Sequence, residues 1–305
     1  MRFGMKRILI LGAFGFIGTN LLKYIDNCAL PYKVITFDRF DCHPMGHCFD
    51  CVEKSYSGDF SDELLIDSVF ENHHIDLVVH GISSTIPTGS QSARYDIESN
   101  LLPTIKLLDV MLKHGCRDIV FLSSGGAVYG NGNQMHTEND VVFPISSYGV
   151  VKVCIEKFLF QYATQFGLKP LVLRLSNPYG HYHTSSKQGI VNIAMRTARQ
   201  GKIFTVWGDG NAIKDYVFVE DVCKVFFGLV DRSVCNEIIN VGSGYVYSVN
   251  EILNLIKRYH PKFKWSYDCA KANDVEASEL DLQKLHRYID MDFHKLEDII
   301  SELEK

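Results

Sequence analysis

The chain of 305 residues lacks the features that mark several classes of protein. No apolar run reaches the roughly 18 residues that a membrane span needs. No run of lysines and arginines stands out, and the net charge of -5 does not suggest a nucleic-acid surface. The nine cysteines are scattered and odd in number, which favours reduced thiols over a disulfide framework. We therefore expect a cytoplasmic protein that binds no nucleic acid and inserts into no membrane.

A glycine-rich turn lies near the start of the chain. The apolar run Ile8–Leu11 predicts a buried strand, and Thr19–Tyr24 predicts an amphipathic helix. Between them stand Gly12, Gly15 and Gly18, whose spacing differs from G-x-G-x-x-G by one residue in its first interval. Glycines at a strand-to-helix turn let the backbone approach a pyrophosphate. An ordinary turn stays an alternative interpretation.

Asp38 ends a second predicted strand, about twenty residues past the glycines, where a carboxylate accepts hydrogen bonds from the ribose hydroxyls of a dinucleotide. Its charge repels a 2′-phosphate, so the position favours NAD over NADP. Arg39 follows at once and can serve a 2′-phosphate, which weakens this preference. An ordinary acid at the end of a strand is the alternative for Asp38.

The segment 41–51 is dense in soft metal ligands. It holds Cys42, His43, His47, Cys48 and Cys51. Their spacing matches no standard structural zinc site, and the segment lies between two predicted strands. We therefore predict an irregular loop with reduced thiols and no bound metal.

Strands and helices alternate along the first part of the chain, which predicts a doubly wound parallel sheet. Ligands of such sheets bind outside the carboxyl ends of the strands. Residues predicted at those ends are Gly12, Asp38, Asp59, Gly81, Ser123 and Ser124. The alternation breaks down after residue 177. We predict a dinucleotide-binding domain over 1–177 and a smaller α/β substrate lobe over 178–305, with a segment near 215–245 returning to the first domain.

Tyr148 and Lys152 lie four residues apart in a predicted helix over 147–166. Side chains at this spacing share one face of a helix. A lysine held there can stabilise a phenolate and lower the phenol pKa from about 10. This pair predicts a base that takes a proton from an alcohol. Beside a nicotinamide cofactor, it is equipped to oxidise a hydroxyl to a ketone.

These motifs are accompanied by others, which follow one another in order along the chain. They comprise Gly12–Gly18, Asp38, Gly58-Asp59, Asn100, Ser123-Ser124, Val128-Tyr129-Gly130, Tyr148, Lys152, Arg174, Asn177-Pro178-Tyr179-Gly180, Trp207–Gly210, Asp215–Asp221, Asn240–Gly244 and Asp274-Val275. In this combination the sequence resembles the extended short-chain dehydrogenase/reductase superfamily, in its NAD-dependent nucleotide-sugar epimerase/dehydratase branch. The resemblance implies NAD as cofactor, a nucleotide-sugar substrate and a homodimer.

The resemblance also implies roles for single residues. Tyr148 is expected to be the base, Lys152 to tune it and to bind the nicotinamide ribose, and Ser124 to bond the reacting hydroxyl. Ser123 is the alternative to Ser124. Expected cofactor contacts are Gly12, Phe14, Gly15, Phe16, Ile17, Gly18, Asp38, Arg39, Asp59, Phe60, Gly81, Ile82, Ser83, Asn100, Ser123, Tyr148 and Lys152. Expected substrate contacts are Ser84, Ser124, Tyr148, Asn177, Gln188, Lys214, Lys271 and Ser278.

Some positions depart from the pattern of the family. The hydroxyl residue usually stands where this chain has Gly125, and arginines usually stand where it has Lys214 and Lys271. Lysine keeps the positive charge but lacks the bidentate geometry that arginine offers to phosphate. The alternative for Lys214 and Lys271 is that they are ordinary surface charges that bind no phosphate. At the position that gates the sugar site in UDP-hexose epimerases the chain has Ser278, a small residue that leaves room for an acetamido group. The alternative is that a small residue is common at this place in the wider superfamily, including members that act on other sugars.

Three functions compete at this point. The first is a nucleotide-sugar 4-epimerase that works through a 4-keto intermediate. The second is a dehydratase, decarboxylase or reductase on the same scaffold. Dehydratases and decarboxylases need an extra acid just after the Ser/Thr, where Gly125 and Gly126 offer no proton donor, which favours the epimerase. The third is a non-catalytic NAD-binding protein, which the presence of both Tyr148 and Lys152 argues against.

Overall fold

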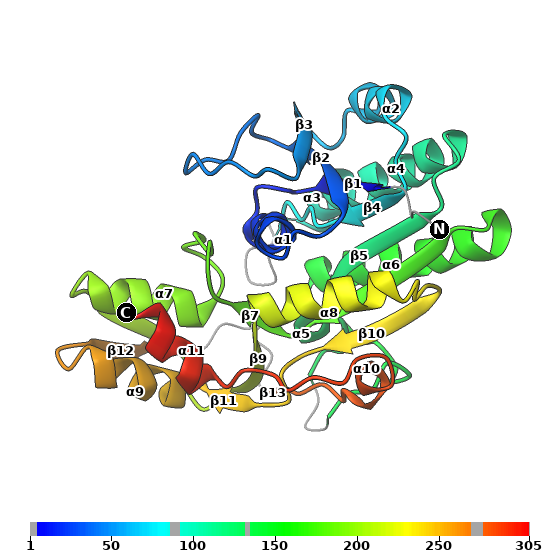
Figure 1. Ribbon diagram of the computed structural model, residues 1–305. Coiled ribbons are helices and arrows are strands. Elements are labelled where there is room, and N and C mark those ends of the chain that lie inside the picture. The colour runs from blue at the N-terminus through cyan, green and yellow to red at the C-terminus, as the bar shows by residue number, and fades with distance from the viewer. Residues whose placement is uncertain (1–4, 86–91, 132–134, 270–276, 305) are drawn as a thin grey trace.

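The structure is a computed structural model that describes residues 5–85, 92–131, 135–269 and 277–304. Its larger part is a parallel sheet of seven strands in the order β10-β6-β5-β4-β1-β2-β3, which confirms the predicted doubly wound fold (Figure 1). The strands are β1 (Lys6–Leu11), β2 (Tyr32–Asp38), β3 (Val52–Ser57), β4 (Leu77–His80), β5 (Asp118–Ser124), β6 (Lys169–Leu175) and β10 (Glu237–Val241).

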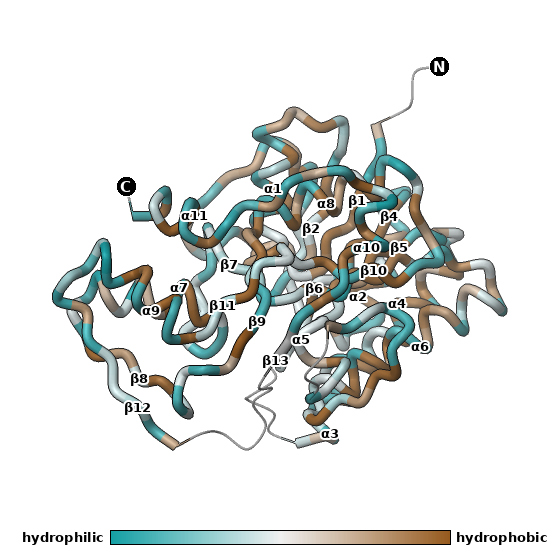
Figure 2. Tube along the Cα trace, turned by 90° about the horizontal axis from the view of Figure 1, so that it is seen from below, coloured by the Kyte–Doolittle hydropathy of each residue, from teal (hydrophilic) through white to brown (hydrophobic). Residues whose placement is uncertain are grey.

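Helices cover both faces of this sheet. One face packs against α1 (Phe16–Asn27) and α8 (Val219–Asp231), and the other against α2 (Glu63–Asn72), α4 (Leu102–Lys113) and α6 (Ser147–Phe166). Each face has its own core of buried aliphatic and aromatic side chains. The central strands are buried on both sides, so β1 is apolar from Ile8 to Leu11 rather than alternating. Figure 2 shows these hydrophobic segments gathered inside the molecule.

The helical segment that precedes β5 is not a uniform α-helix. It consists of α3 (Ala93–Asp96), a π-helical turn η1 (Ile97–Leu101) and then α4, which follow one another directly. Asn100 lies in the π-helical turn, and the Thr104 hydroxyl donates to its carbonyl at 2.6 Å. Such turns are rare and often stand at functional sites. Periodicity alone does not reveal one.

A smaller lobe follows the sixth strand. Its sheet has the order β11-β9-β13, with β7 paired to β9, and a separate pair joins β8 to β12. The strands are β7 (Asn177–Tyr179), β8 (Ile203–Trp207), β9 (Ile213–Phe218), β11 (Val246–Ser248), β12 (Lys264–Asp268) and β13 (Ala277–Ser278). Its helices are α7 (Ile190–Arg199), α9 (Val249–Tyr259) and α11 (Leu296–Leu303). Two short helices, α5 (Gly125–Val128) and α10 (Gln283–His286), pack against the larger part instead. A third core lies between α7, α9, α11 and this sheet.

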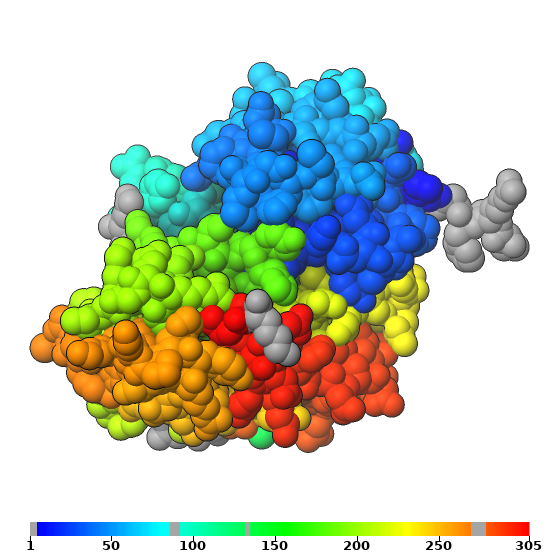
Figure 3. Space-filling model, turned by 60° about the vertical axis from the view of Figure 1, so that its left-hand side comes forward, coloured from blue at the N-terminus to red at the C-terminus, as the bar shows by residue number. Residues whose placement is uncertain are grey.

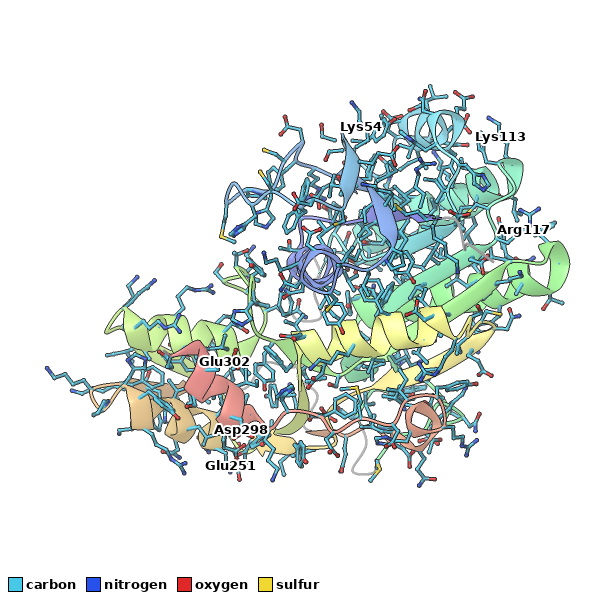
Figure 4. All side chains as sticks on the ribbon, viewed as in Figure 1. Lys54, Lys113, Arg117, Glu251, Asp298 and Glu302 are labelled. Atoms are coloured by element: carbon cyan, nitrogen blue, oxygen red, sulfur yellow. The ribbon has the colours of Figure 1, made fainter. Side chains whose placement is uncertain are left out.

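The chain returns to the larger part twice after it has entered the smaller lobe. The segment from 219 to 241 forms α8 and β10 of the larger part, and α10 packs against β10. Figure 3 shows the N-terminal residues above and the C-terminal residues below, with middle segments between them. Of the six charged residues labelled in Figure 4, five are exposed, and Arg117 is half-buried and donates to the Leu112 and Cys116 carbonyls. Within the residues described, no helix is long and apolar enough to cross a membrane.

The carboxyl ends of the strands meet at one edge of the large sheet. Leu11 is paired with Phe37 on one side and with His80 on the other. β1 therefore lies at the point where the strand order reverses, which is where ligands of open α/β sheets bind. β5 ends at Ser124 on the same edge, and α6 presents Tyr148 beside it.

Candidate active site

The glycine turn packs backbone against backbone. Gly12 has φ +80°, and its N–H donates to the Phe37 carbonyl at 2.8 Å. A Cβ on Gly12 would lie 3.2 Å from the Gly81 carbonyl carbon. A Cβ on Gly18 would lie 2.3 Å from the Gly12 carbonyl oxygen. A side chain at Gly12 would push the end of β1 away from the end of β4, and a side chain at Gly18 would push α1 away from the turn, so the sequence needs glycine at both positions.

The first turn of α1 fits an anionic group. Its N-terminal residue is Gly15, which has no side chain to cap the helix, and the first turn contains no acidic residue. The first backbone N–H groups of a helix lack partners within it and attract anions. The turn that includes Phe16 and Ile17 can therefore hold the pyrophosphate of NAD.

Asp38 braces the glycine turn. Its carboxylate accepts from the Phe14 N–H at 2.9 Å and from the Arg39 N–H at 2.7 Å. The Arg39 guanidinium in turn donates to the Ser84 hydroxyl at 3.3 Å. Ser84, expected to contact the sugar, thus lies beside Arg39 on the side of the expected adenosine. The Asp38 carboxylate stands where the ribose of NAD is expected.

The neighbouring strand ends supply further polar groups. Asp59 accepts from the Ser61 hydroxyl at 2.6 Å and the Ser61 N–H at 2.8 Å, and these bonds lower the Asp59 pKa. Asn100 accepts from the Ser84 N–H at 2.8 Å and so ties the loop after β4 to the π-helical turn. Phe60 is buried and packs against the His80 ring at 5.1 Å. These contacts fix the edge along which the cofactor is expected to lie.

Tyr148 and Lys152 share one face of α6, as their spacing predicted. The helix spans Ser147–Phe166, and the Ser146 hydroxyl caps it by accepting from the Gly149 N–H at 3.2 Å. The Lys152 ammonium is buried, lies 5.7 Å from the centre of the Tyr148 ring and donates to the Leu122 carbonyl at 2.8 Å.

The effect of Lys152 on the Tyr148 pKa differs from our expectation. Burial raises the Tyr148 pKa to about 12, while hydrogen bonding by the Ser124 and Ser83 hydroxyls acts in the opposite direction. Burial also lowers the Lys152 pKa to about 8. We predicted that Lys152 lowers the phenol pKa below its ordinary value. Desolvation dominates instead, because a phenolate loses water when it is taken into the protein.

The two serines at the end of β5 have different surroundings. The Ser123 hydroxyl is buried and donates to a Glu156 carboxylate oxygen at 2.5 Å, away from Tyr148. The Ser124 hydroxyl faces the Tyr148 phenol and acts to lower the Tyr148 pKa. A Cβ at Gly125 would lie 2.7 Å from a Leu280 methyl carbon and 3.2 Å from the Arg174 carbonyl oxygen. This packing explains why glycine, and not serine or threonine, stands at position 125. The bond to Glu156 occupies the Ser123 hydroxyl and so favours Ser124 for the role for which Ser123 was the alternative.

A small cavity lies beside Tyr148. Its lining consists of Ile82, Ser83, Thr85, Asn100, Tyr148, Val151, Lys152 and Ile155. The Ser83 hydroxyl donates to the Thr85 carbonyl at 2.9 Å, so its oxygen can still accept from a neighbouring phenol. Ser83, expected to be a cofactor contact, is therefore also a neighbour of Tyr148.

The expected substrate residues are only partly brought together. The Asn177 side-chain amide donates to the Asp215 carbonyl at 2.9 Å, so it bridges β7 and β9. Lys214 of β9 is paired through the backbone with Ser278 of β13, which puts two of the expected residues side by side. Gln188 is exposed in the loop before α7, and its N–H donates to the Ser185 hydroxyl at 3.2 Å. Lys271 lies outside the described residues.

The loop between β2 and β3 is held by contacts between histidine and aromatic rings. The His43 imidazole is buried, and its ring centre lies 6.0 Å from that of Phe14 and 4.8 Å from that of His47. Burial lowers the His43 pKa. His47 meets Tyr182 of the smaller lobe at 5.1 Å. In the part of the chain that is described, no group of three or more His, Cys, Asp or Glu side chains is placed to hold a metal ion.

Sequence reasoning missed Glu156. It is buried, lies one helical turn beyond Lys152 and bonds with Arg174 and Ser123. Its spacing was the available signal, because Tyr148, Lys152 and Glu156 follow one another at intervals of four on one face of the helix. An acid at that interval also occurs on exposed helices, so the spacing does not by itself reveal a buried partner.

Comparison with known proteins defines the family. The model of the NAD dependent epimerase/dehydratase family matches residues 8–242, so the chain belongs to this family. A putative UDP-glucose 4-epimerase from Methanocaldococcus jannaschii is 32% identical over 283 residues, which cover 91% of this chain and 90% of that protein. The dTDP-4-dehydro-6-deoxyglucose reductase of Escherichia coli is 27% identical over 82% of this chain and 80% of its own length.

Solved structures agree with this assignment. A UDP-glucose 4-epimerase from Thermotoga maritima, in complex with UDP-glucose, has a TM-score of 0.89 at 27% identity and covers 96% of both chains. A UDP-glucose 4-epimerase from Thermus thermophilus, in complex with NAD, has a TM-score of 0.86 at 25% identity, also over 96% of both. The chain is thus an enzyme of an NAD-dependent family of nucleotide-sugar epimerases and dehydratases.

Proposed function

We propose that the protein is an NAD-dependent 4-epimerase of a nucleotide-activated hexose. The observation that carries the proposal is the group formed by Tyr148, Ser124 and Lys152 at the carboxyl edge of the sheet, with no acid beside it at positions 125 and 126. Two hydroxyls and an ammonium suffice to remove and return one hydroxyl proton. The relatives named as UDP-glucose 4-epimerases support the same reaction.

The residues divide the work as follows. NAD supplies the hydride acceptor and donor when it is bound. Tyr148 takes the proton from the hydroxyl at C4 of the sugar and later returns it. Ser124 bonds the same hydroxyl oxygen and orients it toward the phenol. Lys152 stabilises the phenolate by its positive charge, and the burial of its ammonium keeps water from competing for that charge.

The smaller lobe is proposed to hold the nucleotide diphosphate and the sugar. Lys214 offers positive charge, and the backbone of Ser278 runs beside it in β13. Because serine is smaller than tyrosine by a phenol ring, position 278 is compatible with an acetamido group at C2 of the sugar. We propose that the substrates include UDP-N-acetylglucosamine and UDP-N-acetylgalactosamine as well as the glucose and galactose forms.

A second function deserves the same test, because curated relatives include a dTDP-D-glucose 4,6-dehydratase and the reductase named above. Incubating the protein with UDP-, GDP- and dTDP-sugars and identifying products by NMR separates them. A 4-epimerase gives the C4 epimer of one substrate. A dehydratase gives a 4-keto-6-deoxy sugar. The Tyr148→Phe variant, run in parallel, identifies background activity, and a protein that binds NAD but converts none of the sugars contradicts the proposal.

A further inference from the structure

The catalytic helix carries a third polar side chain that the proposed reaction does not use. Glu156 follows Lys152 by four residues, as Lys152 follows Tyr148, and its exposed fraction is 1%. Carboxylates are almost never this buried unless they are paired.

Three donors bind the Glu156 carboxylate. Arg174 of β6 donates from Nη2 at 2.7 Å and from Nε at 3.2 Å, a bidentate arrangement. The Ser123 hydroxyl of β5 donates at 2.5 Å. Arg174 also donates to the Tyr129 hydroxyl at 2.9 Å, which donates to the Asn240 side-chain oxygen of β10 at 2.7 Å. The network thus joins α6 to three adjacent strands of the sheet.

This network touches the catalytic residues at two points. Ser123 directly precedes Ser124, so the bond to Glu156 fixes the end of β5 where Ser124 begins. Lys152 donates to the carbonyl of Leu122, the residue before Ser123. A buried ion pair seldom adds stability over apolar packing, so stability alone gives little reason for one here. Its place, one helical turn from the base and its lysine, points to a role in the site.

The charge of Glu156 also acts on Lys152. The titratable groups that face the Lys152 ammonium are Tyr148 and Glu156 on α6 and His80 on β4. Burial lowers the His80 pKa to about 3, so this ring is neutral near pH 7, and so is Tyr148, whose pKa burial raises to about 12. Burial favours neutral Lys152, and Glu156 opposes this by raising the Lys152 pKa. Arg174, which faces Glu156 from β6, neutralises part of that charge.

We propose that Glu156 is a positioning residue that keeps Lys152 cationic and in place, and that holds Ser124 in register through Ser123. The effect on turnover rests on the proposed epimerase function. The effect on the charge of Lys152 does not, so the two can be tested separately.

The first experiment measures the charge of Lys152 directly. The protein as purified is labelled with ¹³C at the lysine ε carbons and titrated by NMR, and the Lys152 signal is assigned by its loss in Lys152→Arg. In Glu156→Gln the Lys152 pKa should fall by about one unit or more, a tenfold change in the protonation equilibrium. In Glu156→Asp, which keeps the charge, it should stay near that of the unchanged protein. An unchanged pKa in Glu156→Gln overturns the charge role.

Asp221→Asn is the matched control. Asp221 is also a fully buried carboxylate on a helix, but its partners are His294 at 2.8 Å and Lys224 at 3.4 Å. This variant should lower the melting temperature and leave the Lys152 pKa unchanged. If Asp221→Asn shifts the Lys152 pKa as far as Glu156→Gln does, the shift reflects general loosening and the proposal is wrong.

Ser123→Ala tests the positioning role, and it serves even if Glu156→Gln does not fold. It removes one hydrogen bond and keeps the Arg174–Glu156 pair. We expect a several-fold fall in kcat with the Lys152 pKa unchanged, because only the register of Ser124 is affected. A kcat equal to that of the unchanged protein overturns the link from Glu156 to Ser124. If Lys152 titrates as expected but no sugar is epimerised, the charge role stands and the proposed function fails.

Discussion

The substitution Tyr148→Phe examines the base on which the proposed reaction depends. Phenylalanine keeps the ring on the same face of α6 and removes only the hydroxyl, whose pKa Ser124 and Ser83 act to lower. General-base groups contribute typically about 10²- to 10⁴-fold to a rate. Turnover should fall by that factor, while binding of NAD, whose pyrophosphate is expected at the first turn of α1, should persist.

The structure also sets the pH dependence of this step. With the Tyr148 pKa raised to about 12, ionising the phenol at pH 7 costs about 7 kcal/mol, at about 1.4 kcal/mol for each of five pH units. The positive charges of Lys152 and of oxidised NAD favour the phenolate and lower this cost when the site is filled. Since the base form is the deprotonated one, kcat should rise with pH over a range well below pH 12. In Tyr148→Phe this rise should disappear.

The assay follows the interconversion of UDP-glucose and UDP-galactose, or of their acetamido forms, by NMR at a series of pH values from about 6 to about 10. The NAD content of each preparation is measured by absorbance after the protein is denatured. If the variant turns over within a few-fold of the unchanged protein, Tyr148 is not the base. A variant that has lost both turnover and NAD shows that the hydroxyl serves binding, which also refutes the reasoning.

Three other predictions follow from the site. Ser124→Ala should reduce kcat by roughly 10²-fold, which is the rate loss typical of removing one hydrogen-bond donor to a developing charge. This loss should exceed that of Ser123→Ala, and the reverse order in kinetic assays would show that Ser123 bonds the substrate. The protein should purify with NAD and bind NADP at least tenfold more weakly, because the Asp38 carboxylate repels a 2′-phosphate; equal affinities in a titration mean that Arg39 faces the ribose instead. Ser278→Tyr should suppress activity on 2-acetamido sugars and spare UDP-glucose, and an unchanged ratio of the two activities places the gate elsewhere.

The sequence was sufficient for the parts that depend on local pattern. Alternating strands and helices predicted the parallel sheet, and the helix over 147–166 has the bounds that we expected. Regular spacing within one element also brought Tyr148 and Lys152 to one face. Such features follow from backbone geometry and hydrophobic periodicity, which neighbouring residues encode.

The remaining features depend on contacts between distant segments. Leu280 packs on Gly125, which accounts for the absent hydroxyl at that position, yet the two residues are far apart in the chain. The raised Tyr148 pKa reflects burial, which no spacing reveals. The role of Glu156 emerges only when β6 brings Arg174 against α6. Sequence patterns pointed to Tyr148 and Lys152 as the proposed base and its lysine, and only the tertiary structure shows the charges and packing that act on them.

The most direct test of the proposed function follows the hydrogen at C4 of the sugar. UDP-glucose and UDP-N-acetylglucosamine, each deuterated at C4, are incubated with the protein in ordinary water, and the products are examined by NMR and mass spectrometry. Because the hydride is expected to leave and return within one closed site, we predict the C4 epimer with its deuterium retained. Loss of the deuterium to solvent, or a 4-keto-6-deoxy sugar in place of the epimer, would contradict the account.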